Sequence, residues 1–302
     1  MPELIINEEM VLKQLNSLKI DKSPGPDELH PRLLKELAKS LTKPLCIIFK
    51  QSLRLKMIPK EWKKATISAI LKKGNRSMAG NYRPVSLTSA VCKLLEQIIR
   101  EHIIKHMKVN KLFSNKQFGF ISGRSTSLQL REVLDKWIEA IDKGTDVDVI
   151  YMNFQKAFDK VPHKRLTGKA KNYVLDNPLL EWIEDFLTGR TQRESINGST
   201  SDWKEVTSGI TQGSVLGPFL FILFINDLPD GVKSDVYLFA DDTKIVRNIT
   251  DGEEILQDDL ENLENWSNTW LLKFQPEKCK HMKIARVEKT DEFKHKLSGK
   301  KY

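Results

Sequence analysis

Residues 237–246 read Y-L-F-A-D-D-T-K-I-V, which sets two adjacent carboxylates between two short apolar runs. The runs are rich in residues that favour strands, so they predict a β-hairpin with Asp241, Asp242 and Thr243 at its tip. Neighbouring carboxylates repel each other and are costly to bury, whereas the tip of a hairpin holds them at the rim of a sheet. There they could share Mg²⁺, which prefers carboxylate oxygens. The alternative is an ordinary Asp-Asp turn, and this short motif alone does not decide between the two.

On both sides of the hairpin, helical and strand-like patterns alternate along the chain. Residues 65–72 and 148–154 are predicted as strands, and an Asn197-Gly198 pair between two extended runs in 192–206 predicts a second hairpin. Hydrophobic residues at helical spacing predict helices over 7–19, 31–56, 88–108, 127–143, 178–188, 214–228 and 253–270.

The charge is unevenly distributed along the 302 residues, whose formal net charge is +9. Residues 1–130 hold 24 Lys and Arg against 10 Asp and Glu, whereas residues 131–302 hold 25 against 30. A basic front and a mildly acidic back suit a protein that binds phosphates with one part and metal ions with the other. The alternative is that two solvated surfaces differ by chance.

The three cysteines, Cys46, Cys92 and Cys279, are scattered and form no C-x-x-C pair. We therefore expect neither a disulfide partner nor a structural zinc site. The N-terminus does not read as a secretory signal, and the longest apolar run, 219–225, is too short to cross a bilayer. These features predict a protein without membrane attachment in a reducing intracellular compartment.

Seven segments in a fixed order carry a family resemblance that covers nearly the whole chain. Together they resemble the reverse transcriptase of non-LTR retrotransposons (LINE elements), nearest to the jockey and CR1 type. The F-A-D-D-T form beside P-G-P-D favours this group over group II intron maturases and viral RNA polymerases. The segments are K-S-P-G-P-D at 22–27, N-Y-R-P-V-S-L-T at 81–88, F-G-F-I-S-G-R-S-T at 118–126, F-Q-K-A-F-D-K-V at 154–161, T-Q-G-S-V-L-G-P at 211–218, F-A-D-D-T at 239–243 and P-E-K-C-K at 276–280.

The resemblance implies an α+β polymerase of the right-hand type. It implies one reverse transcriptase domain over 1–302, with helix-rich fingers at 1–145, a palm on a small antiparallel sheet at 146–285, and a truncated tail at 286–302 in place of a thumb. The implied reaction uses an RNA template, a DNA primer and a dNTP. The primer 3′-hydroxyl attacks the α-phosphate while Asp241 and Asp242 hold two Mg²⁺ ions. The family's integration chemistry implies a nuclear location.

The same resemblance implies contacts to the incoming nucleotide. Arg83 and either Lys63 or Lys64 would bind the triphosphate, because cationic donors offset phosphate charge. The alternative for such an arginine is surface solvation. Phe158 stands where the family places the aromatic side chain that crowds the nucleotide sugar and disfavours a 2′-hydroxyl. The alternative for Phe158 is a core position.

Two further loops resemble segments of the family that touch the template or the nucleotide. Gln212 and Gly213 lie in a loop that enters a helix, where the glycine permits close approach of the backbone. The family uses this loop to contact template and nucleotide. Gly123, Arg124 and Ser125 resemble the family's template-strand segment.

One departure from the family concerns the metal site. Asn153 stands where the family carries an aspartate that binds both ions, and an amide cannot supply charge or bridge as a carboxylate does. Asp148 is expected on the opposite face of the strand and Asp159 beyond its end, so neither replaces the missing group. We therefore expect weakened Mg²⁺ binding and strongly impaired polymerisation.

Three alternative functions stay open from the sequence. The first is a catalytically inactive protein that still binds RNA or an RNA–DNA hybrid through its basic fingers. The second is an unstable gene fragment without function. The third is a generic α+β binding domain, which would require all seven motifs to be coincidental.

Overall fold

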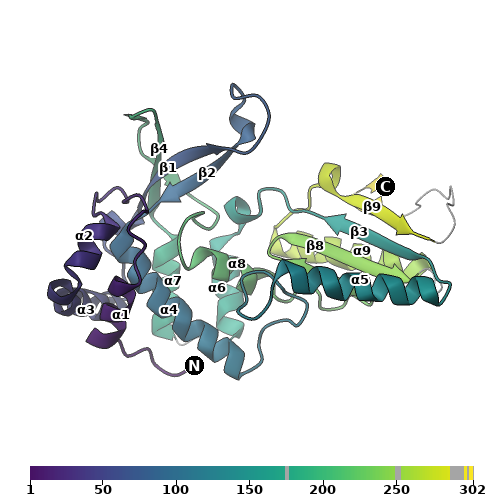
Figure 1. Cartoon of the computed structure of the whole chain (residues 1–302), viewed down its shortest axis with the longest axis horizontal. Helices are drawn as coiled ribbons and strands as arrows, with labels where there is room; N and C mark the ends of the chain where they lie inside the picture. Colours follow the sequence, from purple (N-terminus) through teal and green to yellow (C-terminus); the bar gives the residue numbers. More distant parts are fainter. Residues whose placement is uncertain (174–176, 249–252, 286–295, 298, 302) are drawn as a thin grey trace. The chain divides into compact units, whose positions relative to one another are not determined.

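The computed structural model describes residues 1–302 except 174–176, 249–252, 286–295, 298 and 302 (Figure 1). The chain combines helices with two larger β-sheets, which confirms the predicted α+β class. It forms two compact units. Unit 1 comprises residues 1–112 and 163–220, and unit 2 comprises residues 113–162 and 221–302.

The helices of unit 1 surround a core of large apolar side chains. Trp182 and Phe49 are fully buried, and the Trp182 ring stacks on Phe186 with 5.6 Å between ring centroids. The helices are α1 (Glu8–Asn16), α2 (Pro31–Glu36), α3 (Ala38–Leu55), α4 (Ala90–Val109), α6 (His163–Asn172), α7 (Asn177–Leu187) and α8 (Gly217–Ile225), the last of which crosses the boundary into unit 2. The single helix predicted over 31–56 was wrong, because Leu37, with φ of −90° and ψ of 14°, interrupts it between α2 and α3.

The sheet of unit 1 has the strand order β2-β1-β4-β5, with β6 paired to β4. Strand β1 is antiparallel to β2 and parallel to β4. The Asn197-Gly198 hairpin prediction is confirmed, since both residues have positive φ (50° and 84°), as a type I′ turn requires. The strands are β1 (Lys64–Leu71), β2 (Tyr82–Leu87), β4 (Arg190–Ile196), β5 (Ser199–Thr200) and β6 (Lys204–Val206).

Unit 2 is built on a second, fully antiparallel sheet of order β7-β8-β3-β9. Helix α5 (Thr126–Asp142) runs along this sheet (Figure 1) and buries Val133 and Ala140 against strand residues such as Val149 and Tyr237. Helix α9 (Glu253–Trp270) belongs to the same unit. The strands are β3 (Val147–Met152), β7 (Asp235–Phe239), β8 (Asp242–Asn248) and β9 (Lys280–Ile284).

The two units divide the chain differently from the fingers and palm boundaries. Residues 113–145 belong to unit 2 and residues 163–220 to unit 1. Most of the tail at 286–302 lies outside the described residues, which there comprise the short pair β10 (Lys296–Leu297) and β11 (Lys300–Lys301) and the turn residue Gly299. No helix among the described residues is long and apolar enough to cross a membrane.

The core of unit 1 makes a testable prediction at Trp182. Replacing Trp182 with Ala removes a fully buried ring and its Nε1–H bond to Ser52 Oγ (3.0 Å). We expect the free energy of unfolding to fall by about 3–5 kcal/mol, measured by urea denaturation. Trp203→Ala is the matched control, because that ring is 39% exposed and its loss should cost about 1 kcal/mol. Equal losses in the two variants would contradict this account of the core.

Candidate active site

The tip of the β7–β8 hairpin is a two-residue turn made by Ala240 and Asp241. Phe239 at the end of β7 pairs with Asp242 at the start of β8. Ala240 has a positive φ of 54°, which suits a hairpin turn but is usually reserved for glycine. A left-handed backbone costs an L-residue about 1–2 kcal/mol. The predicted hairpin is therefore confirmed, but its turn lies one residue earlier than expected, because Asp242 and Thr243 already belong to β8. The strained residue immediately precedes the two carboxylates.

Asn153 lies opposite this carboxylate pair. The antiparallel pairing of β3 with β8 sets Met152 against Thr243, and Asn153 follows directly after β3. The Nδ2–H of Asn153 donates a hydrogen bond of 3.2 Å to Oδ1 of Asp242. The backbone of Asn153 is held as well, because its carbonyl accepts a bond of 2.7 Å from Gln275 N–H. An amide thus occupies the position that faces Asp242.

Asp148 has a different partner and does not join this group. Its Oδ1 lies 2.7 Å from Nε2 of His281, and both side chains are about 15% exposed. His281 belongs to β9, on the other side of β3 from Asp242. The geometry agrees with the expectation that Asp148 cannot take the place of the missing carboxylate.

Lys244 is a cation near the two carboxylates. The family motifs did not point to this residue. It lies two residues beyond Asp242 on the same face of β8, opposite Tyr151 of β3 and Tyr237 of β7. Burial lowers the pKa of the Lys244 ammonium, and the negative charge of Asp242 opposes that shift. Its Nζ donates to Oε1 of Gln129 on α5 at 3.3 Å. Strand alternation from Asp242 would have found this residue.

Phe158 packs flat against Phe221 in the same unit. The ring centroids lie 4.6 Å apart at an interplanar angle of 20°. Phe158 is half-buried, so one face of its ring has a packing partner. The core alternative therefore accounts for part of this residue, and its contact to a nucleotide sugar stays a prediction.

Lys63 and Lys64 of unit 1 make different contacts. Lys63 Nζ binds Asp185 Oδ1 at 2.7 Å, and the other oxygen of Asp185 accepts from the N–H of Ile58. Both Lys63 and Asp185 are largely buried, which favours a structural role for this lysine. Lys64 begins β1 and binds the exposed Glu61 at 3.0 Å.

Arg83 is exposed on β2 and lies far along the strands from Lys64. Its register partner on β1 is Ile70, six residues beyond Lys64, or roughly 20 Å at 3.3 Å per residue. Lys72 continues the strand past Ile70, and its N–H donates to Asn81 O at 2.8 Å. Lys72 and Lys73 are exposed beside Arg83 in the same hairpin. The cations nearest to Arg83 along this hairpin are therefore residues that the motif comparison did not single out.

The loop with Gln212 and Gly213 is docked on β2. The Gln212 carbonyl accepts a bond of 2.7 Å from Ser86 N–H. Gly213 has φ of 118°, and a Cβ there would lie 2.3 Å from the Ser86 carbonyl oxygen. Only glycine fits this approach. The structure thus brings the loop to the strand that carries Arg83.

A buried carboxylate fixes the far end of this loop. Glu96 of α4 is 1% exposed, and its Oε2 accepts from the N–H groups of Val215 (2.7 Å) and Leu216 (2.9 Å) just before α8. Burial raises the pKa of Glu96, while the two backbone donors oppose that shift. Unsatisfied N–H groups at a helix N-terminus favour such a carboxylate.

Gly123, Arg124 and Ser125 lie in a loop where the two side chains bind backbone groups of the same segment. Nη1 of Arg124 donates to three backbone carbonyls of residues 114, 115 and 117 in its own loop. Ser125 caps α5, because its Oγ accepts from the N–H of Leu128 at 3.2 Å. Gly123 has φ of 86° with open space around its missing Cβ. A template contact by these residues stays a prediction.

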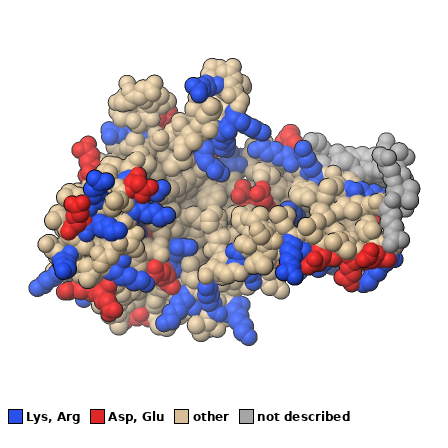
Figure 2. All heavy atoms as spheres, viewed as in Figure 1, with Lys and Arg blue, Asp and Glu red and all other residues tan. Residues whose placement is uncertain are grey.

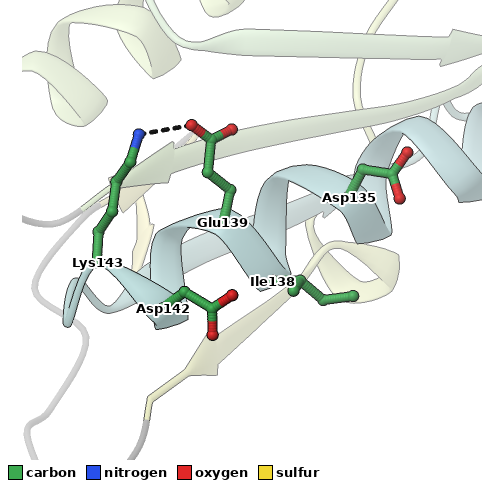
Figure 3. Close-up of a pocket in the computed structure, with 5 residues that line it drawn as sticks. All are labelled: Asp135, Ile138, Glu139, Asp142 and Lys143. Carbon is green, nitrogen blue, oxygen red and sulfur yellow. Dashed lines mark hydrogen bonds and ion pairs between the residues drawn. The ribbon is translucent and has the colours of Figure 1, made fainter.

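A shallow hollow on the outer face of α5 lies apart from the carboxylate hairpin. Its lining comes from one helix and the residue after it, and Lys143 Nζ pairs with Glu139 at 2.5 Å (Figure 3). Such ion-paired surface residues offer a small molecule little enclosure. The lining residues are Asp135, Ile138, Glu139, Asp142 and Lys143.

The docked loop makes a testable prediction at Gly213. Gly213→Ala adds a Cβ against the Ser86 carbonyl at an unfavourable φ, so we expect the free energy of unfolding to fall by about 3 kcal/mol. Gly198→Ala is the matched control in the same unit, since it has φ of 84° but nothing within 4 Å of the new methyl group. That control should lose about 1 kcal/mol. Urea denaturation measures both, and similar losses would contradict the close approach.

Comparison with known proteins places this geometry in a family. Residues 70–295 match the family described as reverse transcriptase (RNA-dependent DNA polymerase). The RNA-directed DNA polymerase from mobile element jockey of Drosophila melanogaster is 31% identical over 297 residues, which cover 94% of this chain and 32% of that protein. The probable RNA-directed DNA polymerase from transposon BS of the same species is 31% identical over 285 residues, 90% of this chain and 31% of that protein.

A more distant relative agrees with this placement. The Pol polyprotein from type-1 retrotransposable element R1 of Bradysia coprophila is 28% identical over 250 residues, 81% of this chain and 24% of that protein. The chain spans about a third of the length of the curated relatives first described. On this evidence the chain belongs to the reverse transcriptase family, among the RNA-directed DNA polymerases of non-LTR retrotransposons.

Proposed function

We propose that this chain carries the nucleotidyl-transfer site of a retrotransposon RNA-directed DNA polymerase, centred on Asp241 and Asp242. The observation that supports this proposal most directly is the pair of adjacent carboxylates at a hairpin tip, with a third oxygen-bearing side chain, Asn153, facing Asp242. In this proposal the sheet of unit 2 is the palm and the β1–β2 hairpin belongs to the fingers. An RNA template, a DNA primer and a dNTP are the substrates.

The side chains at the hairpin fit a divalent cation only in part. Asp241 and Asp242 offer carboxylate oxygens, and Asn153 offers an amide carbonyl once its N–H bond to Asp242 is released. No group of three or more His, Cys, Asp or Glu suited to a metal ion occurs among the described residues. Mg²⁺ held by this pair would neutralise phosphate charge and activate the primer hydroxyl. Two carboxylates suit one ion better than two.

Asn153 is the weak point of this site. An amide brings no negative charge, and here its nitrogen directs a donor at the oxygen of Asp242 that a metal ion would need. Lys244, two residues away on the same face, adds positive charge near the pair. Loss of one charge-stabilising contact to a transferring phosphate costs about 3 kcal/mol, or a rate factor of at least 10². We therefore propose that polymerisation by this chain is slow.

Exposed cations of unit 1 are the proposed partners of a nucleotide triphosphate. Arg83, Lys72 and Lys73 present exposed cations on one hairpin, and the Gln212 loop is docked on the same strand as Arg83. Cationic side chains and backbone N–H groups are the usual partners of phosphate oxygens. Lys63 is left out of this group because Asp185 binds its ammonium.

Substitution at Asn153 tests the proposed function. Asn153→Asp restores a carboxylate opposite Asp242, so we expect primer extension on an RNA template with Mg²⁺ to become at least about 10²-fold faster. Asn172→Asp, an equal charge change at an exposed residue of α6, should leave the rate unchanged. The double variant Asn153→Asp with Asp242→Asn should return to the slow rate. Equal rates for the starting chain and Asn153→Asp would refute the proposed role of this position.

Asn153 and the charge distribution together favour a second function, which is binding of nucleic acid without catalysis. The protein would bind RNA or an RNA–DNA hybrid without extending a primer, since Asn153 removes a charge that catalysis needs while residues 1–130 keep 24 Lys and Arg. Figure 2 shows basic side chains along the β1–β2 hairpin, where Lys72, Lys73, Arg76 and Arg83 are exposed.

The salt dependence of RNA binding tests this second function. Each phosphate contact to single-stranded nucleic acid contributes about 0.7 to the slope of log K against log salt concentration. The variant Lys72→Gln with Lys73→Gln should reduce that slope by about 1.4. The matched control, Lys39→Gln with Lys43→Gln, removes two exposed lysines from α3 and should leave the slope unchanged. Equal slopes in both double variants would remove this hairpin from the binding surface.

A further inference from the structure

We propose that Gln117 is a positioning residue for the carboxylate pair, holding the left-handed backbone of Ala240 through its amide oxygen. This inference rests on the proposed function only for its consequence in catalysis. The contacts themselves lie entirely within unit 2.

The segment around Gln117 extends the sheet of unit 2 at β7. The N–H of Phe118 donates to the Leu238 carbonyl at 2.8 Å, and the N–H of Leu238 donates to the Lys116 carbonyl at 2.9 Å. These bonds form a parallel bridge between Gln117 and Leu238. They fix the backbone of Gln117 two residues from the hairpin turn.

The side chain of Gln117 then reaches the turn itself. Its Oε1 accepts two backbone hydrogen bonds, from Gly119 N–H at 2.7 Å and from Ala240 N–H at 3.0 Å. Gln117 is fully buried and Ala240 is 6% exposed, so water does not readily replace this acceptor. A buried N–H without a partner costs about 1–3 kcal/mol. The bond therefore stabilises the turn in which Ala240 takes its positive φ.

Gly119 permits this arrangement because it has no Cβ. A Cβ at this position would lie 2.5 Å from the backbone nitrogen of Ala240. Real Cβ atoms do not approach a backbone nitrogen so closely, so any larger residue would push the two backbones apart. The close contact of Gly119 and the shared acceptor Oε1 of Gln117 therefore connect residues 117–119 to the turn.

Arg124 in turn holds the loop that carries Gln117. Its guanidinium donates to the carbonyls of Ser114, Asn115 and Gln117, and its Cζ lies 5.7 Å from the centroid of the Phe118 ring. These contacts give Arg124 a supporting role in the same network.

The Oε1 acceptor of Gln117, and not its Nε2 donor, is the part of the side chain that makes hydrogen bonds here. Within the part of the chain that the structure describes, Nε2 is buried and has no hydrogen-bond partner. An unpaired donor is unfavourable, and an apolar side chain would avoid it. An apolar residue at this position would leave two backbone N–H groups, those of Gly119 and Ala240, without this acceptor.

Freeing the Ala240 N–H is expected to misplace the carboxylates. Ala240 and Asp241 form the whole turn between Phe239 and Asp242, so a change of the backbone at Ala240 reorients the side chains that follow it. A displacement of about 1 Å at a reacting centre can lower a rate by about 10²-fold. Binding of a nucleotide by groups of unit 1 should be affected much less.

Amide hydrogen exchange of Ala240 tests the contact without any catalysis. In Gln117→Met the Ala240 amide should exchange at least about tenfold faster, whereas Gln117→Glu keeps an acceptor oxygen and should retain most of the protection. Gln129→Met is the matched control, since Gln129 is a glutamine of unit 2 that is 2% exposed and whose Oε1 accepts from Lys244 Nζ. If Gln117→Met does not fold, Gly119→Ala provides the second variant, with the same expected loss of protection. Unchanged exchange of Ala240 would overturn the proposal.

Turnover in the Asn153→Asp background tests the consequence. Adding Gln117→Met should lower kcat at least about tenfold and change KM for the dNTP less than about twofold, with recovery in Gln117→Glu. A kcat within twofold of the Asn153→Asp chain would overturn the positioning role. If the Asn153→Asp chain extends no primer, the proposed function fails. The role of Gln117 is then still decided by two measurements that need no turnover. These are the amide exchange rate of Ala240 and the affinity for Mn²⁺, which we expect to be weaker in Gln117→Met than in the starting chain.

Discussion

The antiparallel pairing of β3 with β8 is the constraint on which the candidate site depends. It brings Asn153 to Asp242 across 89 positions of sequence, and the hydrogen bond between their side chains follows from that register. A slip of one residue would turn every side chain of β3 to the other face of the sheet. The buried residues Val147 and Val149, packed under α5, make such a slip costly and thereby fix the position of Asn153.

In unit 1 the loop at 211–216 is also held in place, but by hydrogen bonds to the loop backbone and not by strand pairing. The loop is held at one end by the Ser86 backbone and at the other by the buried carboxylate of Glu96. Burial disfavours the charged form of Glu96 and thereby raises its pKa. The two backbone donors offset part of that cost, so the carboxylate and the start of α8 stabilise each other. Both units therefore position an irregular loop with buried polar side chains.

Local patterns predicted most of the helices and the two hairpins. The Asn197-Gly198 turn and the hairpin that carries Asp241 and Asp242 could be predicted because turn chemistry and strand alternation act over a few residues. The residues of the second turn, Ala240 and Asp241, were not predicted, because neither alanine nor a following aspartate marks a left-handed position. The break at Leu37 was missed, since neither proline nor glycine marks it and apolar residues continue across it. Strand β2 was recognised only as a sequence motif, because the proline at position 84 weakens its strand pattern.

The contacts of individual side chains were less predictable than the elements. The sequence could not decide between Lys63 and Lys64, because Asp185, which binds Lys63, lies 122 positions away. Arg124 was interpreted as a template contact, which stays a prediction. The carbonyl partners of its guanidinium, all within ten residues, could not be predicted, because they depend on the path of the loop. Gln117 was not singled out at all. Its acceptor role exists only once the chain has brought Ala240 back beside it, 123 positions later.

The buried cysteines offer a way to observe the two units separately. Cys46 and Cys92 lie in unit 1 and Cys279 in unit 2, and all three cysteines are at most 5% exposed. Burial also raises the pKa of the Cys92 thiol, which keeps it in the unreactive protonated form. Alkylation by a reagent in solvent therefore requires that the unit around each thiol opens. The natural sequence thus carries an internal reporter of local unfolding in each unit, without any introduced label.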